Sequence, residues 1–249
     1  MAGPAAAADD DGVSSRTSDA GAPRPSTVLV FSRTTGFRHE SIPAGIEAVR
    51  RLGREDGFAV DATEDPAAFT TENLSRYDVV AWLSTSGDVL DDTQRAAFEG
   101  YVRGGGGYVG VHGAADTEYD WPWYGGLVGA YFREHPDPQP AMVRVEDPKH
   151  PSTAHLGVTW TRFDEWYDYR TNPRATARIP GITVLLSVDE STYTGAGMGE
   201  DHPIAWCQLY EGGRAFYTGL GHTTESFAEP AFLAHLVGGI RWAAGPDHG

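Results

Sequence analysis

The chain has one cysteine, few basic residues and no long apolar run. A single thiol, Cys207, excludes both an intrachain disulfide and a cysteine-rich metal site. Lys and Arg number 19 against 35 Asp and Glu, and the net charge of −16 argues against binding to nucleic acid or an anionic membrane surface. No run approaches the roughly 20 apolar residues of a membrane-spanning helix. We therefore predict a soluble protein with a small neutral ligand.

The length of 249 residues, 40% of them hydrophobic, suits one large domain. Residues 1–26 are rich in Ala, Asp, Ser, Gly and Pro and lack hydrophobic periodicity, so we predict a disordered tail there. The domain then spans 27–244, and residues 245–249 form a C-terminal tail. The first 26 residues also lack the basic start and apolar core of a signal peptide, which favours a cytoplasmic location. A linker left after removal of an export signal has the same composition, so an exported protein is the alternative.

The first half of the domain alternates short apolar runs with amphipathic segments. The apolar runs predict strands at 27–32, 58–61, 77–83 and 107–111. Helices are predicted after Ser41 and after Asp91, where Gln94 completes a capping box. This alternation indicates an α/β fold with a parallel sheet and helices on both faces. Ligands of such sheets bind beyond the carboxyl ends of the strands, so we expect three loops to converge: 33–40, 84–90 and 112–124.

The second half of the domain is richer in strands. Apolar runs predict strands at 141–146, 182–188, 203–209 and 214–219. A closing helix is predicted at 229–243, with Phe232, Leu236 and Ile240 on the side that packs against the rest of the domain.

Residues 107–116 are the most informative stretch of the sequence. An apolar strand runs into the glycine-flanked turn Gly110-Val-His-Gly-Ala114, which matches the elbow that presents a catalytic side chain at the end of a strand. Small neighbours let such a turn close while the central side chain projects beyond the sheet. The central residue here is His112, so the elbow suits acid/base or metal chemistry better than acyl transfer.

Four separated segments resemble one family. They are Val28-Leu-Val-Phe, Gly36-Phe-Arg-His, the elbow at 110–114, and Gly219-Leu-Gly-His222, the last followed by Phe227 and Pro230-Ala-Phe-Leu. In this order they resemble the ThuA-like trehalose-utilisation family over roughly residues 27–244. The resemblance implies a variant of the class I glutamine amidotransferase fold, a flavodoxin-like three-layer α/β sandwich with a mostly parallel central sheet.

The resemblance also shows what this chain lacks. Amidotransferases of this fold carry a cysteine at the elbow and a late His-x-Glu, whereas this chain has His112 at the elbow and His222-Thr-Thr-Glu225 near its end. Cys207 lies within the apolar run 203–209, where a buried, unactivated thiol is expected. We therefore predict that the protein has no amidotransferase activity.

Histidines and carboxylates at strand ends form the candidate active site. We predict His112, His222 and Glu165 as catalytic residues, because histidine transfers protons near neutral pH and a carboxylate beside it raises its basicity. His39, Glu40, Asp116 and His135 are predicted to bind substrate. Each has a structural alternative: a buried histidine bonds a neighbouring backbone group, and Glu40 favours the positive end of the helix after Ser41. The other histidines are assigned structural or surface roles, most clearly His235 inside the closing helix.

An aromatic block, Tyr119-Asp-Trp-Pro-Trp-Tyr124, adds a second signal. Trp121, Trp123 and Tyr124 are predicted to bind substrate, because aromatic rings stack on the apolar faces of sugars. The alternative is that the block packs a connecting helix onto the sheet.

The family resemblance implies disaccharide catabolism, with cleavage of 3-keto-glycosides made by a partner sugar 3-dehydrogenase. A ketone at C3 acidifies the proton at C2, so a base can remove it while an acid assists departure of the group at C1. A divalent metal, zinc or manganese, held by His39, His112 and His222 would polarise the keto-sugar oxygens. The alternative function is a non-catalytic module that binds a carbohydrate or a partner protein, and a homo-oligomer is compatible with either function.

Overall fold

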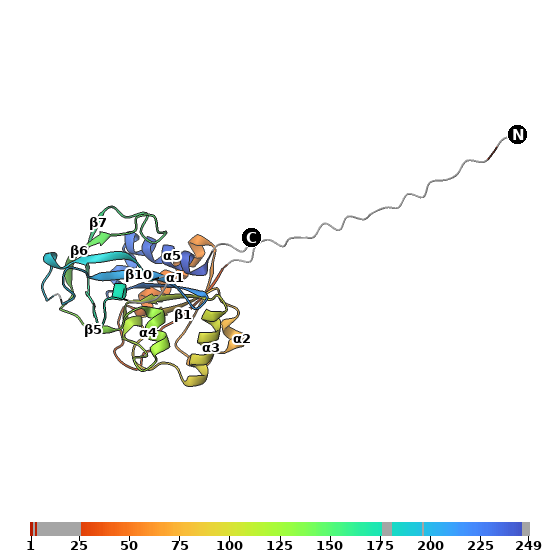
Figure 1. The fold of residues 1–249 in the computed structure, drawn as a ribbon, viewed down its shortest axis with the longest axis horizontal. Coiled ribbons are helices and arrows are strands. Elements are labelled where there is room, and N and C mark those ends of the chain that lie inside the picture. Colours follow the sequence, from red (N-terminus) through yellow and green to blue (C-terminus); the bar gives the residue numbers. More distant parts are fainter. Residues whose placement is uncertain (2, 4–25, 176–180, 196, 246–249) are drawn as a thin grey trace.

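The computed structural model describes residues 1, 3, 26–175, 181–195 and 197–245. A nine-stranded sheet forms the centre of this part of the chain, in the order β2-β1-β3-β4-β11-β10-β9-β6-β7. Figure 1 shows α1 and α5 on one face of the sheet and α2, α3 and α4 on the other. The tails predicted at 1–26 and 245–249 lie almost entirely outside the described residues.

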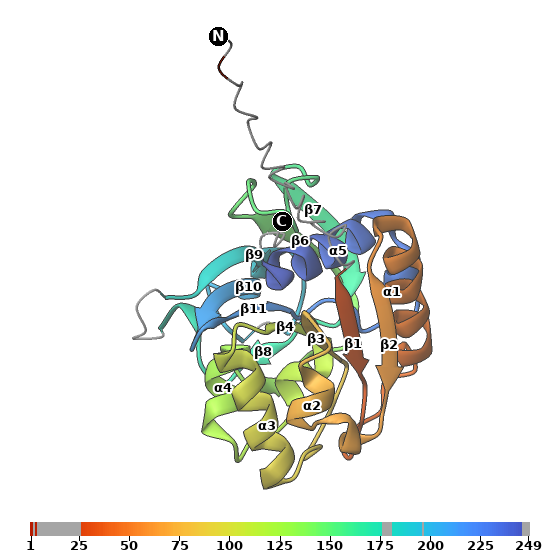
Figure 2. The same cartoon turned by 90° about the vertical axis from the view of Figure 1, so that its right-hand side faces the viewer.

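One half of the sheet is parallel, as the alternation of strands and helices predicts. It contains β2 (Ala59–Thr63), β1 (Thr27–Phe31), β3 (Val79–Leu83), β4 (Gly107–Val111) and β11 (Gly213–Thr218). Every residue of β3 and β4 is buried, because helices cover both faces of these central strands (Figure 2).

Five helices flank the sheet. They are α1 (Ile42–Asp56), α2 (Thr71–Leu74), α3 (Asp92–Arg103), α4 (Pro122–Val128) and α5 (Pro230–Ala244) among the described residues. Asp91 and Gln94 form the predicted capping box at the start of α3. Phe232, Leu236 and Ile240 of α5 are buried, as the apolar spacing predicts. None of the described helices combines the length and hydrophobicity needed to cross a membrane.

The other half of the sheet is antiparallel, which makes the whole sheet mixed. It contains β10 (Pro203–Tyr210), β9 (Thr183–Asp189), β6 (Gln139–Val145) and β7 (Thr159–Asp164). Only Glu211 and Gly212 join β10 to β11, both with positive φ, and a two-residue link permits only antiparallel neighbours. Two further strands, β5 (Phe132–Glu134) and β8 (Asp168–Tyr169), pair with each other.

The sequence patterns do not predict β7, and the reason lies in its inward residues. Its side chains alternate between exposed and buried, but two of the three buried positions are Arg162 and Asp164. Charged residues at inward positions hide the apolar alternation by which a strand is recognised. The site described below explains why these charges are buried.

The carboxyl ends of β1, β3, β4 and β11 lie at one edge of the sheet, because these strands are parallel. The three loops expected to converge do so. Thr34 bridges to Ser86, and Gly87 bridges to Thr117, so the loops after β1, β3 and β4 lie side by side. This edge carries the candidate site.

Candidate active site

The predicted elbow is present at His112. Strand β4 ends at Val111, and His112 takes a left-handed backbone conformation with φ of 48°, which is costly for a residue other than glycine. The next residue must be small, since a Cβ atom on Gly113 would lie 2.9 Å from the Thr85 carbonyl oxygen. The His112 side chain is fully buried, and its Nδ1 donates a hydrogen bond to the Gly219 carbonyl at 2.8 Å. That bond leaves the lone pair on Nε2.

His222 and Glu165 meet His112 at this Nε2 atom. His222 follows β11, and its Nδ1 lies 3.2 Å from His112 Nε2. Glu165 follows β7, and its Oε2 lies 3.3 Å from His112 Nε2 and 3.2 Å from His222 Nδ1. The three catalytic candidates, far apart in the sequence, thus converge at one edge of the sheet.

His39 completes the cluster. Its ring centre lies 4.7 Å from that of His112 and 5.2 Å from that of His222, with both pairs edge to face. Its Nδ1 is buried and has no hydrogen-bond partner. Burial, and then the neighbouring His112 and His222, lower the pKa of His39 to about 3. This imidazole is therefore neutral and carries a lone pair in a dry environment.

Glu165 and His222 each favour the charged form of the other. Burial works to raise the pKa of Glu165, but hydrogen bonds and charge from His112 and His222 outweigh it and hold the pKa well below its usual range. Burial likewise works to lower the pKa of His222, but the hydrogen bond and charge of Glu165 outweigh it and raise the pKa. Glu165 is therefore an ionised carboxylate at neutral pH.

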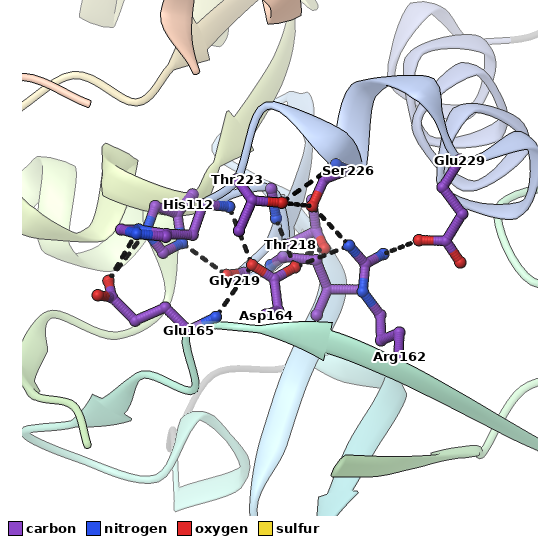
Figure 3. Close-up of polar contacts among 12 residues, drawn as sticks. His112, Arg162, Asp164, Glu165, Thr218, Gly219, Thr223, Ser226 and Glu229 are labelled. Atoms are coloured by element: carbon purple, nitrogen blue, oxygen red, sulfur yellow. Dashed lines mark hydrogen bonds and ion pairs between the residues drawn. The ribbon is translucent and has the colours of Figure 1, made fainter. Parts of the chain in front are cut away.

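Asp164 and Arg162 position two members of the cluster, and sequence reasoning missed both. The fully buried Asp164 carboxylate accepts hydrogen bonds from the backbone N–H groups of Glu165 at 3.0 Å, His222 at 3.0 Å and Gly221 at 2.9 Å. Arg162 pairs with the same carboxylate at 2.9 Å. Figure 3 shows Asp164 between Glu165 and the Arg162 guanidinium. The only sequence feature that could have identified these two residues is a pair of charges in an otherwise strand-like segment.

Among the other predicted substrate-binding residues, His135 and Asp116 lie beside the cluster, whereas Glu40 does not contact it. His135 Nδ1 is 3.1 Å from Glu165 Oε1, and the side chain keeps 37% of its surface exposed. Asp116 is half-buried; burial raises the pKa of its carboxyl although it accepts a hydrogen bond from the Tyr119 hydroxyl at 2.6 Å. Glu40 is exposed next to His39 and takes no part in the cluster.

The aromatic block packs α4 against the core. Trp121 stacks on Trp123 and on Tyr124, and Tyr124 is fully buried with its hydroxyl bonded to Ala114 and Tyr108. The indole N–H groups of Trp121 and Trp123 bond Glu99 and Glu211. Within the described residues, these ring and polar contacts do not reach the histidine cluster. The structure thus shows the packing role that was the alternative interpretation of this block.

The cluster fits a divalent metal ion. One ligand atom from each of His39, His112, Glu165 and His222 lies within 4.8 Å of the others. The Nδ1 of His39 is buried without a hydrogen-bond partner, and the Nε2 of His112 contacts only two other members of the cluster, His222 at 3.2 Å and Glu165 at 3.3 Å, among the described residues. Mixed imidazole and carboxylate ligation is the chemistry of zinc and manganese sites.

A second group of similar residues lies on another part of the fold. Asp168, Glu190 and His202 also have potential ligand atoms within 4.8 Å of one another. Both nitrogens of His202 already have partners: Nδ1 contacts Glu190 at 2.9 Å, and Nε2 donates to the Tyr167 carbonyl at 2.9 Å. His202 was assigned a structural role from the sequence, and these bonds show it joining the residue before β8 to the segment after β9.

Comparison with known proteins identifies the family. A family model described as ThuA, trehalose utilisation, matches residues 27–243. A solved ThuA-like protein from Bacteroides uniformis is 28% identical, with a TM-score of 0.76 over 92% of this chain and 95% of that chain. One from Parabacteroides merdae is 22% identical, with a TM-score of 0.73 over 89% and 91%.

More distant likeness extends to the fold alone. A cytoplasmic protein from Salmonella typhimurium is 13% identical, with a TM-score of 0.57 over 87% of this chain and 98% of that chain. No curated protein matches the chain significantly. Because the family model covers nearly all of the described sheet and every residue of the cluster, the chain belongs to the ThuA family.

Proposed function

We propose that the protein cleaves 3-keto-disaccharides at the cluster of His39, His112, Glu165 and His222. The family description connects the chain to trehalose utilisation, and so to sugar metabolism. The observation that carries the proposal is the convergence of three imidazoles and one carboxylate from four separate segments. A site with this composition binds metals and transfers protons, whereas a site that only holds a sugar needs neither. The cluster therefore favours an enzyme over a non-catalytic binding module.

The proposed fold is a flavodoxin-like variant of the class I glutamine amidotransferase sandwich. Its parallel strands follow the order β2-β1-β3-β4-β11, which matches the flavodoxin-like order 2-1-3-4-5 with β11 in fifth place. Amidotransferase chemistry is not proposed, because His112 occupies the elbow. Cys207 is buried in β10, where burial raises the pKa of its thiol to about 12.

Burial divides the proposed roles among the cluster residues. His39 and His112 are buried, so they suit metal ligation, which needs no contact with bulk solvent. His222 joins them as the third imidazole ligand and keeps 24% of its side chain exposed. Glu165 is also buried, but its Oε1 faces the more exposed His135 at 3.1 Å, so this pair suits proton transfer to and from substrate. A zinc or manganese ion bound there would polarise the keto oxygen of the sugar.

The reaction then needs one base and one acid from the chain. We assign Glu165 as the base, since it is an ionised carboxylate at neutral pH and can therefore accept a proton. It takes the proton from C2; the C2–H electron pair forms a C1–C2 double bond as the C1–O bond breaks. His135 donates a proton to the departing oxygen, so the second sugar leaves as an alcohol. Addition of water to the double bond would complete a net hydrolysis.

The substrate chemistry implies an earlier oxidation. The ketone at C3 must be introduced before cleavage, so a sugar 3-dehydrogenase is the proposed pathway partner. The proposed location is the cytoplasm, in keeping with the distant Salmonella protein described as cytoplasmic.

Purified protein tests this proposal directly. We expect release of glucose from 3-keto-trehalose but not from trehalose, and loss of the activity when a chelator removes divalent metal. Absence of product from 3-keto-trehalose in the presence of added zinc or manganese would refute the enzymatic proposal.

A further inference from the structure

A cavity of about 530 Å³ lies beside the cluster. It is lined by Arg162, Phe163, Thr223, Glu225, Ser226 and Glu229. Two of these residues are chain neighbours of the active site: Thr223 directly follows His222, and Phe163 precedes Glu165 by two positions. The cavity volume falls in the range of small-molecule sites. Figure 3 shows Thr223 between His112 and Ser226, with Glu229 beyond Ser226 on the side away from Glu165.

Phe163 gives the cavity an exposed aromatic wall. The side chain is 51% exposed, although it sits in the regular strand β7. The face of a phenyl ring stacks on the apolar face of a pyranose, so this wall suits a sugar ring.

The remaining lining residues suit a neutral, hydroxyl-rich ligand. Arg162 is almost fully buried, and its charge is matched by Asp164 at 2.9 Å and Glu229 at 3.4 Å. Its Nε and Nη1 atoms lack hydrogen-bond partners. Glu225 adds an exposed carboxylate, so the cavity carries an excess of negative charge, which disfavours an anionic occupant. The buried Ser226 hydroxyl is already bonded to Arg162 at 2.8 Å and to Thr223 at 3.0 Å, whereas the half-buried Thr223 hydroxyl can also bond a sugar hydroxyl.

We propose that this cavity binds the second, departing sugar ring of the disaccharide while the keto sugar lies at the histidine cluster. The inference rests on the proposed function, since it assumes that a sugar occupies the cluster. The cavity would explain a preference for a disaccharide over a simple glycoside through Phe163, Thr223 and Glu225, which have no role in the proposed catalytic steps. Phe163 is the stacking residue, the Thr223 hydroxyl donates or accepts a hydrogen bond with a sugar hydroxyl, and the Glu225 carboxylate accepts one.

Binding measurements with sugars that lack the ketone test the cavity separately from the chemistry. The probes are trehalose and methyl α-glucoside, titrated calorimetrically into the wild type and the Phe163→Ala and Leu209→Ala variants. Leu209 is the matched control, because it is 53% exposed on β10 and lies outside the cavity lining. We expect Phe163→Ala to weaken the binding of trehalose and of methyl α-glucoside about tenfold each, because the unoxidised ring of either sugar occupies the cavity, whereas Leu209→Ala changes neither. Phe163→Trp, which keeps a stacking ring, should retain the trehalose affinity.

The outcomes separate this inference from the proposed function. Equal trehalose affinity in wild type and Phe163→Ala overturns the cavity assignment, even if 3-keto-trehalose is cleaved. Absence of trehalose binding by a wild type that cleaves 3-keto-trehalose also overturns it, because the second ring then contributes nothing. Trehalose binding that depends on Phe163, in a protein that leaves 3-keto-trehalose intact, supports the cavity and refutes the cleavage.

Discussion

At the scale of single residues, the account depends on His112. Its left-handed backbone and the bond from Nδ1 to Gly219 fix which nitrogen faces His222 and Glu165. A side chain buried to this degree acts through a bound metal or through its neighbours rather than on solvent. The sequence alone predicted the elbow, because glycine on both sides of a central residue is a local pattern.

Replacement of His112 tests that role. In His112→Asn the shorter side chain tolerates positive φ but cannot place a nitrogen at the Nε2 position. We expect turnover of 3-keto-trehalose to fall at least a hundredfold, since a metal ligand or proton-transfer partner is lost, with little change in the unfolding midpoint. His155→Asn is the control, because His155 is exposed and bonds only the Ala231 carbonyl through Nε2. Wild-type turnover in His112→Asn would remove this residue from the mechanism.

Other residues at this scale could not be predicted. Asp164 and Arg162 belong to an edge strand whose inward positions are charged, and no local pattern connects them to backbone groups near residue 222. Trp121 and Tyr124 show the opposite case: their composition suggests a sugar site, yet their rings pack into the core. In a sequence, an aromatic residue is as consistent with burial in the core as with ligand binding, and only its neighbours in the structure distinguish the two roles.

At the scale of elements, the site depends on a close approach of two strand ends. The turn from β4 into His112 passes so near Thr85, just after β3, that only glycine fits at position 113. Strands predicted from apolar runs were found at or near the expected positions, because buried strands carry a simple pattern. The antiparallel order of the second half was not predicted, since pairing depends on contacts distant in sequence.

Two glycine substitutions test the close approach. Gly113→Ala puts a methyl group 2.9 Å from the Thr85 oxygen, and we expect a loss of about 1–3 kcal/mol in the free energy of unfolding. Gly100→Ala is the matched control within α3, where a Cβ atom meets nothing within 4 Å, and it should gain about 0.5–1 kcal/mol from helix propensity. Urea unfolding of both variants gives the comparison. Equal stability of the two variants would show that the strand ends can move apart freely.

At the scale of the whole molecule, folding buries histidines in the neutral form. His235 in α5 is fully buried, donates from Nδ1 to the Ser152 carbonyl at 2.8 Å and accepts from Thr218 at 3.1 Å. Burial lowers the pKa of His235 to about 3, whereas an unfolded histidine has a pKa near 6.5. The stability due to this neutral ring is therefore full above pH 6.5 and is lost progressively as the pH falls toward 3. The structural role predicted for this residue from the helical pattern is confirmed.

Because His235 is buried in its neutral form, the free energy of unfolding should decrease in acid. Between pH 7 and pH 5 we expect His235 to account for a loss of about 2 kcal/mol in the free energy of unfolding. His235→Gln, which cannot be protonated, should lose correspondingly less over the same range, while the exposed-site variant His155→Gln should behave as wild type. Denaturant unfolding at the two pH values measures this difference. An unchanged pH dependence in His235→Gln would show that the ring is not neutral in the folded protein.

The central claim is that His39, His112 and His222 form a metal centre beside Glu165. Titration of zinc into metal-free protein, followed by calorimetry, tests it most directly, with His39→Ala as the variant and His155→Ala as the control. His39 is the decisive ligand, because its Nδ1 is buried without any protein partner. We predict zinc binding by the wild type that weakens at least tenfold in His39→Ala and is unaffected in His155→Ala. Zinc binding that is absent in the wild type, or equal in wild type and His39→Ala, would contradict the account.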